Sequence, residues 1–239
     1  MLLFYVRHGD PIYNPDQLTP LGERQAEAIG RRLARFGIDK IYASTSNRAI
    51  QTSKPTCEIL KQEAELLDFC NENHAWDELA IRNDQGNLTW PFHHRQISRL
   101  FATKSVRDLG DKWYEHPDLK QYDFKPGIER IAREADKLLS SLGYEHDREM
   151  GCYRITRPND ERIALFAHQG FGLAFLSSIL DIPYPVFCTH FDMGHTGLSV
   201  IEFANRDDGI TVPKALTVAN DGHLLADNMP TAYQNYIRF

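Results

Sequence analysis

The stretch Leu2-Leu3-Phe4-Tyr5-Val6-Arg7-His8-Gly9 begins with five apolar residues and then changes abruptly to a cation, an imidazole and a glycine. An apolar run without polar alternation is typical of a strand buried on both faces, in a sheet that helices cover on each side. Arg7 and His8 follow at the carboxyl end of this strand, where open α/β sheets bind their ligands. Gly9 leaves room for a turn or a close backbone approach. A guanidinium beside an imidazole at this place indicates a phosphate ligand.

A second strand of the same buried type occurs late in the chain, at residues 163–167, and ends in His168-Gln169-Gly170 before an apolar helix at 171–180. Between the two, a strand at 38–43 leads through a polar turn into a helix that begins near Arg48. Because the carboxyl ends of parallel strands share one edge of a sheet, these segments should meet in one crevice. Helix amino ends add positive potential there, which suits a phosphoryl group. The side chains expected to meet are those of Arg7, His8, Arg48 and His168.

The rest of the chain alternates between predicted helices and strands, with one change of composition. Thr19 caps a helix at 20–36, and the clearest amphipathic helix follows at 128–142. Residues 86–127 are rich in aromatic side chains, His and Arg at irregular spacing, which indicates an inserted cap within a single α/β domain spanning residues 1–239. The remaining predictions are a strand at 66–70, a polar loop at 71–78, a strand at 152–156, and a hairpin of strands at 199–203 and 210–218.

Composition and charge limit the possible classes of function. A chain of 239 residues with 42% hydrophobic residues can bury one sizeable core. The net charge of −6 offers no basic surface for nucleic acid or an acidic membrane, so we expect local cations to bind a small phosphorylated metabolite. The four cysteines lie far apart, and neither a secretory signal nor a membrane-spanning apolar run occurs. These features predict a protein of the reducing cytoplasm.

Several motifs resemble those of the histidine phosphatase superfamily, also called phosphoglycerate-mutase-like. Arg7-His8-Gly9 matches the family's mark at the end of the first strand, and Asn14 matches its loop asparagine. Residues 19–26 resemble the helix start Leu-Thr-x-x-Gly-x-x-Gln-Ala, and residues 44–52 resemble Ser-x-x-x-Arg-Ala-x-Gln-Thr. Residues 166–170 resemble the family's second-histidine segment. The resemblance therefore covers all the segments that are predicted to meet in the crevice.

This resemblance implies a three-layer αβα sandwich with a mostly parallel central sheet, in which His8 is phosphorylated without a metal or other cofactor. The residue chemistry agrees, because an imidazole is substantially neutral near pH 7 and can attack phosphorus when its other nitrogen is held by a hydrogen bond. Arg7, Arg48 and a cationic His168 would then stabilise the equatorial oxygens of the phosphoryl group. The two histidines within residues 190–195 match no strong zinc template, so we expect no metal site there.

The family supplies the leaving group's proton from a carboxylic acid in the segment after the third strand. Glu72 is the preferred candidate, because Asn71-Glu72-Asn73-His74 resembles the Asn-Glu-Arg-His segment of the mutase branch, with Asn73 in place of Arg. Glu78 is the alternative, because Trp76-Asp77-Glu78 resembles a later Trp-Glu-Gly segment of the same family. After phosphorylation of His8, the same carboxylate would activate water.

Candidate substrate-binding residues are less sharply indicated. The resemblance points to Gly9, Asn14 and Gln169, and the loop before residue 199 adds His195 and Thr196; His93, His94 and Arg95 would line the cap. Gln169 stands where the phytase-like branch carries its acidic Asp, which disfavours that branch. The sequence Pro126-Gly127-Ile128-Glu129 lacks the Ser of the mutase branch's Gly-Glu-Ser segment, which weakens an expectation of 3-phosphoglycerate recognition.

The preferred function is that of a metal-independent phosphatase that hydrolyses a small phosphomonoester through a phosphohistidine on His8. The alternatives are a phosphoglycerate-type mutase, which would return the phosphoryl group to a substrate hydroxyl, and a non-catalytic module of the same fold that binds a phosphorylated ligand. The presence of a nucleophile, two arginines, a second histidine and a candidate acid favours an enzyme.

Overall fold

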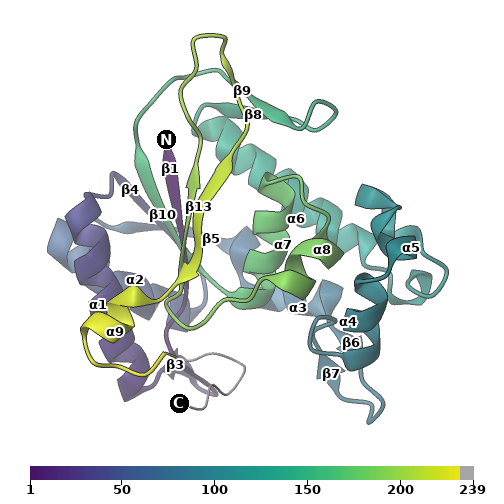
Figure 1. Cartoon of the computed structure of the whole chain (residues 1–239). Helices are drawn as coiled ribbons and strands as arrows, with labels where there is room; N and C mark the ends of the chain where they lie inside the picture. The colour runs from purple at the N-terminus through teal and green to yellow at the C-terminus, as the bar shows by residue number, and fades with distance from the viewer. Residues whose placement is uncertain (232–239) are drawn as a thin grey trace.

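The computed structural model describes residues 1–231, and its centre is a six-stranded sheet (Figure 1). Strand β1 pairs in parallel with β10, β10 with β4 and β4 with β5, whereas β11 runs antiparallel to both β1 and β13. In spatial order the strands are β13 (Lys214–Asn220), β11 (Leu198–Glu202), β1 (Leu2–Arg7), β10 (Arg162–Ala167), β4 (Lys40–Ser44) and β5 (Ala64–Leu67). The predicted, mostly parallel central sheet is confirmed.

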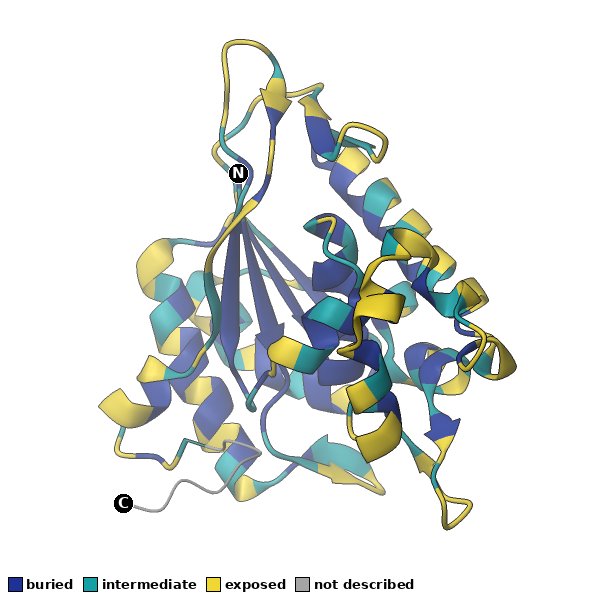
Figure 2. Cartoon of the chain, turned by 45° about the vertical axis from the view of Figure 1, so that its right-hand side comes forward, coloured by how far each residue is buried: buried dark blue, intermediate teal, exposed yellow. Residues whose placement is uncertain are grey.

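Helices cover both faces of this sheet, as the uninterrupted apolar strands predict. Helices α1 (Pro20–Phe36) and α2 (Asn47–Leu60) lie on one side, and α6 (Lys125–Ser141) and α7 (Gln169–Ile179) lie on the other (Figure 1). Alternate residues of β1 point to opposite layers. Phe4 belongs to the core cluster on the α1 side, and Tyr5 belongs to the cluster that includes residues of α6 and α7. The central strands are therefore buried throughout (Figure 2), and the three-layer αβα sandwich is confirmed.

The connections of β1 and β10 create a crevice between their carboxyl ends. The two strands are neighbours in register, with Arg7 opposite Ala167. The chain leaves β1 toward α1 on one face, whereas it leaves β10 into α7 on the other face. Where neighbouring parallel strands diverge in this way, the loops part and leave room for a ligand. This topology places the residues that follow the two strands, His8 and His168, side by side.

The segment after β5 differs from its predicted form. The strand predicted at 66–70 ends at Leu67, and a 3₁₀ turn, η1 (Asp68–Cys70), follows it. The residues predicted as a polar loop form helix α3 (Glu72–Leu79). The Asn71 side chain caps this helix by accepting a hydrogen bond from the amide of Asn73, and Ala75 and Leu79 are buried in the core. An N-cap residue followed by two apolar residues four positions apart indicates a helix. The polar composition of the rest of the segment favoured a loop instead.

Residues 86–127, predicted as an inserted cap, consist mainly of short helices. Most of their large aromatic side chains pack into the core, where Trp113 contacts Phe101, Phe124 and Tyr184. The following helix begins at Lys125, three residues before the predicted start. The elements of this region are β6 (Ile81–Arg82), β7 (Leu88–Thr89), α4 (Arg95–Phe101), α5 (Lys104–Arg107), η2 (Gly110–Glu115) and η3 (Lys120–Tyr122).

The late strands also differ in part from their prediction. Strand β11 pairs with β13 as expected for a hairpin, but the strand predicted at 210–218 is divided into β12 (Ile210–Thr211) and β13. Strand β12 joins a second, three-stranded sheet with β9 (Cys152–Ile155) and β8 (Tyr144–Asp147). The other elements are β2 (Pro11–Tyr13), β3 (Asp16–Leu18), α8 (Tyr184–His190) and α9 (Gly222–Ala226). Within residues 1–231, no helix is both long and apolar enough to span a membrane.

Candidate active site

A cavity of about 730 Å³ opens at the carboxyl ends of β1, β10 and β4. Four of the predicted catalytic residues, Arg7, His8, Arg48 and Glu72, line it, together with Gln169. His168 lies directly beneath it, with its ring centre 5.2 Å from that of His8. The other lining residues are Tyr13, Asp16, Thr45, Ser46, Asn47, Asn71, Asn73, Trp76 and Trp90.

The imidazole of His8 is held in the tautomer that a nucleophile needs. Its Nδ1 lies 2.7 Å from the carbonyl oxygen of Gly9, which can only accept, so Nδ1 carries the proton and Nε2 keeps its lone pair. Burial lowers the pKa of His8 well below its usual value, and the neighbouring His168, Arg7 and Arg48 lower it further. His8 is therefore neutral at pH 7. It can attack an electrophile without a separate base.

The two arginines leave buried hydrogen-bond donors without partners. Arg7 donates one terminal N–H to the carbonyl of Met193, and Arg48 donates one to the Asp16 carboxylate at 2.8 Å. The Nε atoms of both arginines are buried and have no hydrogen-bond partner among the described residues. A buried donor without a partner lowers the stability of the fold unless a ligand accepts a hydrogen bond from it. Two buried guanidiniums with unused N–H groups beside a neutral imidazole have the chemistry that suits a phosphoryl group.

His168 occupies the predicted place, where its charge depends on its neighbours. Its Nδ1 accepts a hydrogen bond from Arg48, with Nη2 at 3.2 Å, and its Nε2 therefore carries the proton and donates to Ser44 Oγ at 2.8 Å. Burial and the two arginines lower the pKa of His168 well below its usual value. Among the protein's own charges His168 is therefore neutral, because two fixed positive charges already stand beside it, and its cationic form beside a phosphoryl group stays a prediction. A bound phosphoryl dianion would raise this pKa.

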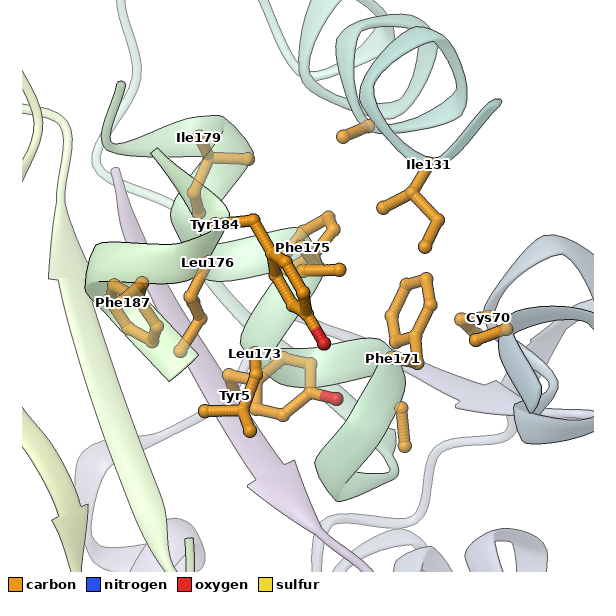
Figure 3. Packing of buried hydrophobic residues seen from close by; sticks show 14 of the residues in the cluster. Tyr5, Cys70, Ile131, Phe171, Leu173, Phe175, Leu176, Ile179, Tyr184 and Phe187 are labelled. Atoms are coloured by element: carbon orange, nitrogen blue, oxygen red, sulfur yellow. The ribbon is translucent and has the colours of Figure 1, made fainter. Parts of the chain in front are cut away.

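Tyr5 fixes the backbone of His168, a role that the motif search missed. Its hydroxyl donates to the His168 carbonyl at 2.6 Å and accepts from the His168 amide at 3.2 Å. Figure 3 shows the Tyr5 ring beneath α7, packed among the core side chains of that helix. Gly172 makes room for it, since a Cβ there would lie 2.4 Å from the Tyr5 hydroxyl. The sequence did contain a signal for this role, because Tyr5 is the one residue with a hydroxyl group in the apolar run of β1.

Glu72 faces the same cavity from the first turn of α3. Its two carboxyl oxygens accept hydrogen bonds from the amides of Gly170 at 2.9 Å and Phe171 at 3.3 Å, at the start of α7. Burial outweighs these hydrogen bonds and the arginine charges, and it raises the pKa of Glu72 to about 7. The carboxyl group is thus close to half protonated at neutral pH. Glu72 has the proton affinity that a general acid requires.

Glu78, the alternative acid, has a structural position. Arg130 of α6 donates to both of its carboxyl oxygens, with Nε at 2.7 Å and 2.9 Å and Nη2 at 2.6 Å. The same guanidinium donates to the carbonyl of Phe69 at 3.1 Å. Glu78 does not line the cavity. Its contacts join α3 to α6.

Replacing Glu78 with Ala should therefore destabilise the protein without removing its chemistry. The lost ion pair leaves Arg130 partly buried and unpaired, which we expect to lower the free energy of unfolding by about 2 kcal/mol. Urea unfolding monitored by circular dichroism checks this value, with Glu63→Ala at an exposed site as the matched control. Turnover of p-nitrophenyl phosphate should stay within about twofold of wild type; a loss of two orders of magnitude in a folded Glu78→Ala variant would return Glu78 to the candidate acids.

Gln169 is the one predicted substrate-binding residue that lines the cavity. Its side-chain amide donates to the carboxylate of Asp192, so it stands oriented at the base of the site. Gly9 instead donates its amide to Thr52 Oγ1 at 3.0 Å, and a Cβ on Gly9 would lie 2.7 Å from the Gly22 carbonyl oxygen. Gly9 thus allows α1 to approach the nucleophile and does not contact the cavity.

The other predicted substrate contacts lie outside the cavity lining. Asn14 is exposed in the turn between β2 and β3, and its neighbour Tyr13 lies over Arg48, with the guanidinium carbon 5.3 Å from the ring centre. His195 lies beside His8, at 5.7 Å between ring centres, with its Nδ1 3.4 Å from the Asp10 carboxylate. The buried Thr196 donates its amide to the Arg7 carbonyl at 3.1 Å. The structure gives His195 and Thr196 supporting positions around the end of β1.

From residues 86–127, Trp90 is the residue that reaches the cavity, and His93, His94 and Arg95 do not line it. His94 instead caps α4, where its Nδ1 accepts from the amide of Ile97. The sequence also gave no direct indication of Asn73 and Trp76, because they fall in the segment predicted as a loop. Within residues 1–231, no group of three or more His, Cys, Asp or Glu side chains could hold a metal ion.

The fold and the site define an αβα protein with an imidazole and two guanidiniums in a crevice shaped for a phosphoryl group. The family model "Histidine phosphatase superfamily (branch 1)" matches residues 3–115, which include Arg7, His8, Arg48 and Glu72. The resemblance seen in the motifs is thereby confirmed. Residues 3–115 are similar to the histidine phosphatase superfamily, as the motifs of the sequence predict.

Solved structures of related fold agree over nearly the whole chain. A protein titled "Mycobacterial hydrolase 1" is 20% identical, with a TM-score of 0.56, and the match covers 90% of this chain and 97% of that one. A phosphoserine phosphatase from Entamoeba histolytica, solved with 3-phosphoglyceric acid, is 18% identical, with a TM-score of 0.56 and coverage of 93% and 98%. A mycobacterial glucosyl-3-phosphoglycerate phosphatase is 20% identical, with a TM-score of 0.56 and coverage of 90% and 97%. A search of curated proteins finds no match.

Proposed function

We propose that the protein is a phosphatase that hydrolyses a small phosphomonoester through a phosphohistidine on His8. The observation that carries this proposal is the pairing of two shifted groups across one cavity. His8 is kept neutral with Nε2 free, and Glu72 is kept near half protonation. The surroundings lower the pKa of one group and raise the pKa of the other. Such a pair of titratable groups is typical of sites that combine a nucleophile with a general acid. The superfamily and the phosphatases of similar fold support the same class of activity.

The first chemical step forms a bond between His8 Nε2 and phosphorus. As the P–O bond to the leaving group breaks, its electron pair goes to the leaving oxygen, which takes the proton of Glu72 and departs as an alcohol. The Nδ1–H of His8, held on the Gly9 carbonyl, stabilises the positive charge that develops on the ring. The unpartnered N–H groups of Arg7 and Arg48 donate hydrogen bonds to the equatorial phosphoryl oxygens.

The second step reverses the roles of the same groups. The Glu72 carboxylate removes a proton from water, water oxygen attacks phosphorus, and the P–N bond breaks with its electron pair returning to Nε2 of His8. Inorganic phosphate leaves and Glu72 is again protonated. Because two buried guanidiniums supply the positive charge at the phosphoryl group, we propose that neither half-reaction needs a metal ion. Full activity in the presence of a chelator is the expected result.

Trapping the covalent intermediate tests the proposed function. A substrate with labelled phosphate, quenched in denaturant at alkaline pH, should leave phosphate on His8 that is stable to base and labile to acid, which peptide mass spectrometry locates. Analysis of products should show free phosphate. An isomerised phosphoglycerate without free phosphate would support the mutase instead, and tight binding of a phosphorylated metabolite with no label on His8 would support a non-catalytic module.

The rate of hydrolysis of alkyl phosphates should fall as the pH rises through about 7. The pKa of Glu72 is raised, so its protonated form is abundant below that value and is lost above it. We expect kcat for an alkyl phosphate to decrease about tenfold per pH unit on the alkaline side. p-Nitrophenyl phosphate, whose leaving group needs little protonation, should lack this limb. A common alkaline limb for both substrates would assign the decrease to another group.

A further inference from the structure

We propose that the preferred substrate is the phosphomonoester of a neutral, ring-bearing alcohol, such as a sugar phosphate, with no second anionic group. This inference rests on the proposed phosphatase function and concerns the part of the cavity above the phosphoryl group. Three features of that part carry it: the distribution of charge, an unpaired amide at the rim, and an aromatic wall.

The positive charges of the cavity all lie at its base. Arg7 and Arg48 are the only Arg or Lys side chains among the described residues that line it, and the phosphoryl group would use both. The remaining charged lining residues are the acids Asp16 and Glu72. Asp16 holds Arg48 through one oxygen at 2.8 Å and accepts from the amide of Asn47 through the other, also at 2.8 Å. A second anionic group on the substrate would therefore find no further cation in the lining and would meet the Asp16 carboxylate.

Asn73 lies at the exposed end of the cavity, two positions after the cap residue of α3. Its backbone amide is used by the cap, but its side chain makes no hydrogen bond within residues 1–231. The neighbouring Asn71 is already engaged, since its side chain donates to Thr45 and accepts from the Asn73 amide. The Asn73 side chain therefore offers a free donor and a free acceptor. Such an amide suits a neutral hydroxyl group and does not compensate a carboxylate charge.

Trp76 and Trp90 form an aromatic part of the cavity wall. Their rings meet edge to face at 5.0 Å, and Trp90 stacks on Phe92 at 5.7 Å with an interplanar angle of 10°. Trp90 also packs against the start of α7, where a Cβ on Gly170 would lie 2.2 Å from its ring. Trp90 is buried, whereas Trp76 remains partly exposed on the cavity side. A rigid aromatic surface of this kind suits the apolar face of a ring.

Matched pairs of substrates test the charge argument in the wild-type protein. Glucose 6-phosphate and 6-phosphogluconate share a phosphorylated sixth carbon, but the second carries a carboxylate in place of the neutral ring. Glycerol 3-phosphate and 3-phosphoglycerate form the corresponding acyclic pair. We expect kcat/KM to favour the neutral member of each pair about tenfold or more, and glucose 6-phosphate to exceed glycerol 3-phosphate. Equal values within both pairs, or preference for the acids, would overturn the inference.

Two variants locate the selectivity on the named residues. Asn73→Arg adds a cation at the rim and should shift the ratio for each pair about tenfold toward the acid, whereas Gln121→Arg, the same charge change outside the cavity, should not. Trp76→Ala should lower the ratio of kcat/KM for glucose 6-phosphate to kcat/KM for glycerol 3-phosphate. An unchanged neutral-to-acid ratio in a folded Asn73→Arg variant would contradict the role of Asn73.

The same measurements separate this inference from the proposed function. If wild type forms phosphohistidine and hydrolyses p-nitrophenyl phosphate but shows no selectivity within the pairs, the substrate class is wrong and the phosphatase stands. If no substrate labels His8 and none is hydrolysed, the proposed function fails and the inference fails with it. Preference for a nucleoside monophosphate over glucose 6-phosphate would support the inference of a neutral, ring-bearing alcohol. It would show that this alcohol is a nucleoside and not a simple sugar.

Discussion

Replacing His8 with Ala is expected to lower kcat for every phosphomonoester by about 10⁴-fold or more, because the variant has no atom that can form the covalent intermediate. The loss should be the same for alkyl and aryl leaving groups, since both depend on attack by Nε2. The cavity should survive, because the strand pairing of β1 does not use this side chain. Steady-state kinetics measure the loss, and the quenched reaction should show no protein-bound phosphate.

His190→Ala is a suitable control, because His190 lies exposed at the end of α8 and does not line the cavity. Its kcat should stay within about twofold of wild type. Phosphate or vanadate should still bind to His8→Ala, since Arg7 and Arg48 remain. A His8→Ala variant that keeps more than a tenth of wild-type turnover would contradict the proposed mechanism.

Glu72→Gln should slow hydrolysis of an alkyl phosphate by about 10²–10³-fold, because an alkoxide leaving group cannot depart without a proton. The same change should slow formation of the phosphoenzyme from p-nitrophenyl phosphate less than tenfold. Gln keeps the shape of the side chain and can accept one of the two α7 amide hydrogen bonds that Glu72 accepts at 2.9 Å and 3.3 Å. Single-turnover measurements on the two substrates separate the effect on the first step from that on hydrolysis.

The control for this prediction is Glu78→Gln, which changes a carboxylate of the same helix that is bonded to Arg130 and lies outside the cavity lining. It should not discriminate between the two leaving groups. Equal slowing of alkyl and aryl phosphates by Glu72→Gln would show that Glu72 positions α7 and that the proton comes from another residue.

Local sequence patterns were sufficient for the fold and for the residues at the base of the cavity. The unbroken apolar run of β1 predicted a strand buried on both faces, and the same pattern predicted β10 and hence the parallel sheet. A side chain that directly follows such a strand lies at the ligand-binding edge whatever the details of packing. For this reason, Arg7, His8, Arg48 and His168 could be brought together from the sequence alone.

The sequence favoured Glu72 over Glu78 only through the resemblance of a short motif, because the two carboxylates lie six residues apart in similar polar surroundings. The tertiary structure separates them through distant partners: the amides of Gly170 and Phe171 for Glu72, and the guanidinium of Arg130 for Glu78. The charge of His168 depends in the same way on Arg48, 120 positions earlier in the chain. Protonation is set by burial and by neighbours in space, which residue order does not contain.

The sequence by itself thus determined the central sheet and the positions of His8, Arg7 and Arg48 at its ligand-binding edge, since these follow from strand ends and short motifs. Only the tertiary structure decided that burial raises the pKa of Glu72 to about 7, that the pKa of His168 is lowered, and that Trp90 is the residue of 86–127 that reaches the cavity. The physical reason is that aromatic packing and electrostatic environment arise from contacts between segments far apart along the chain, whereas strand ends are encoded by adjacent residues.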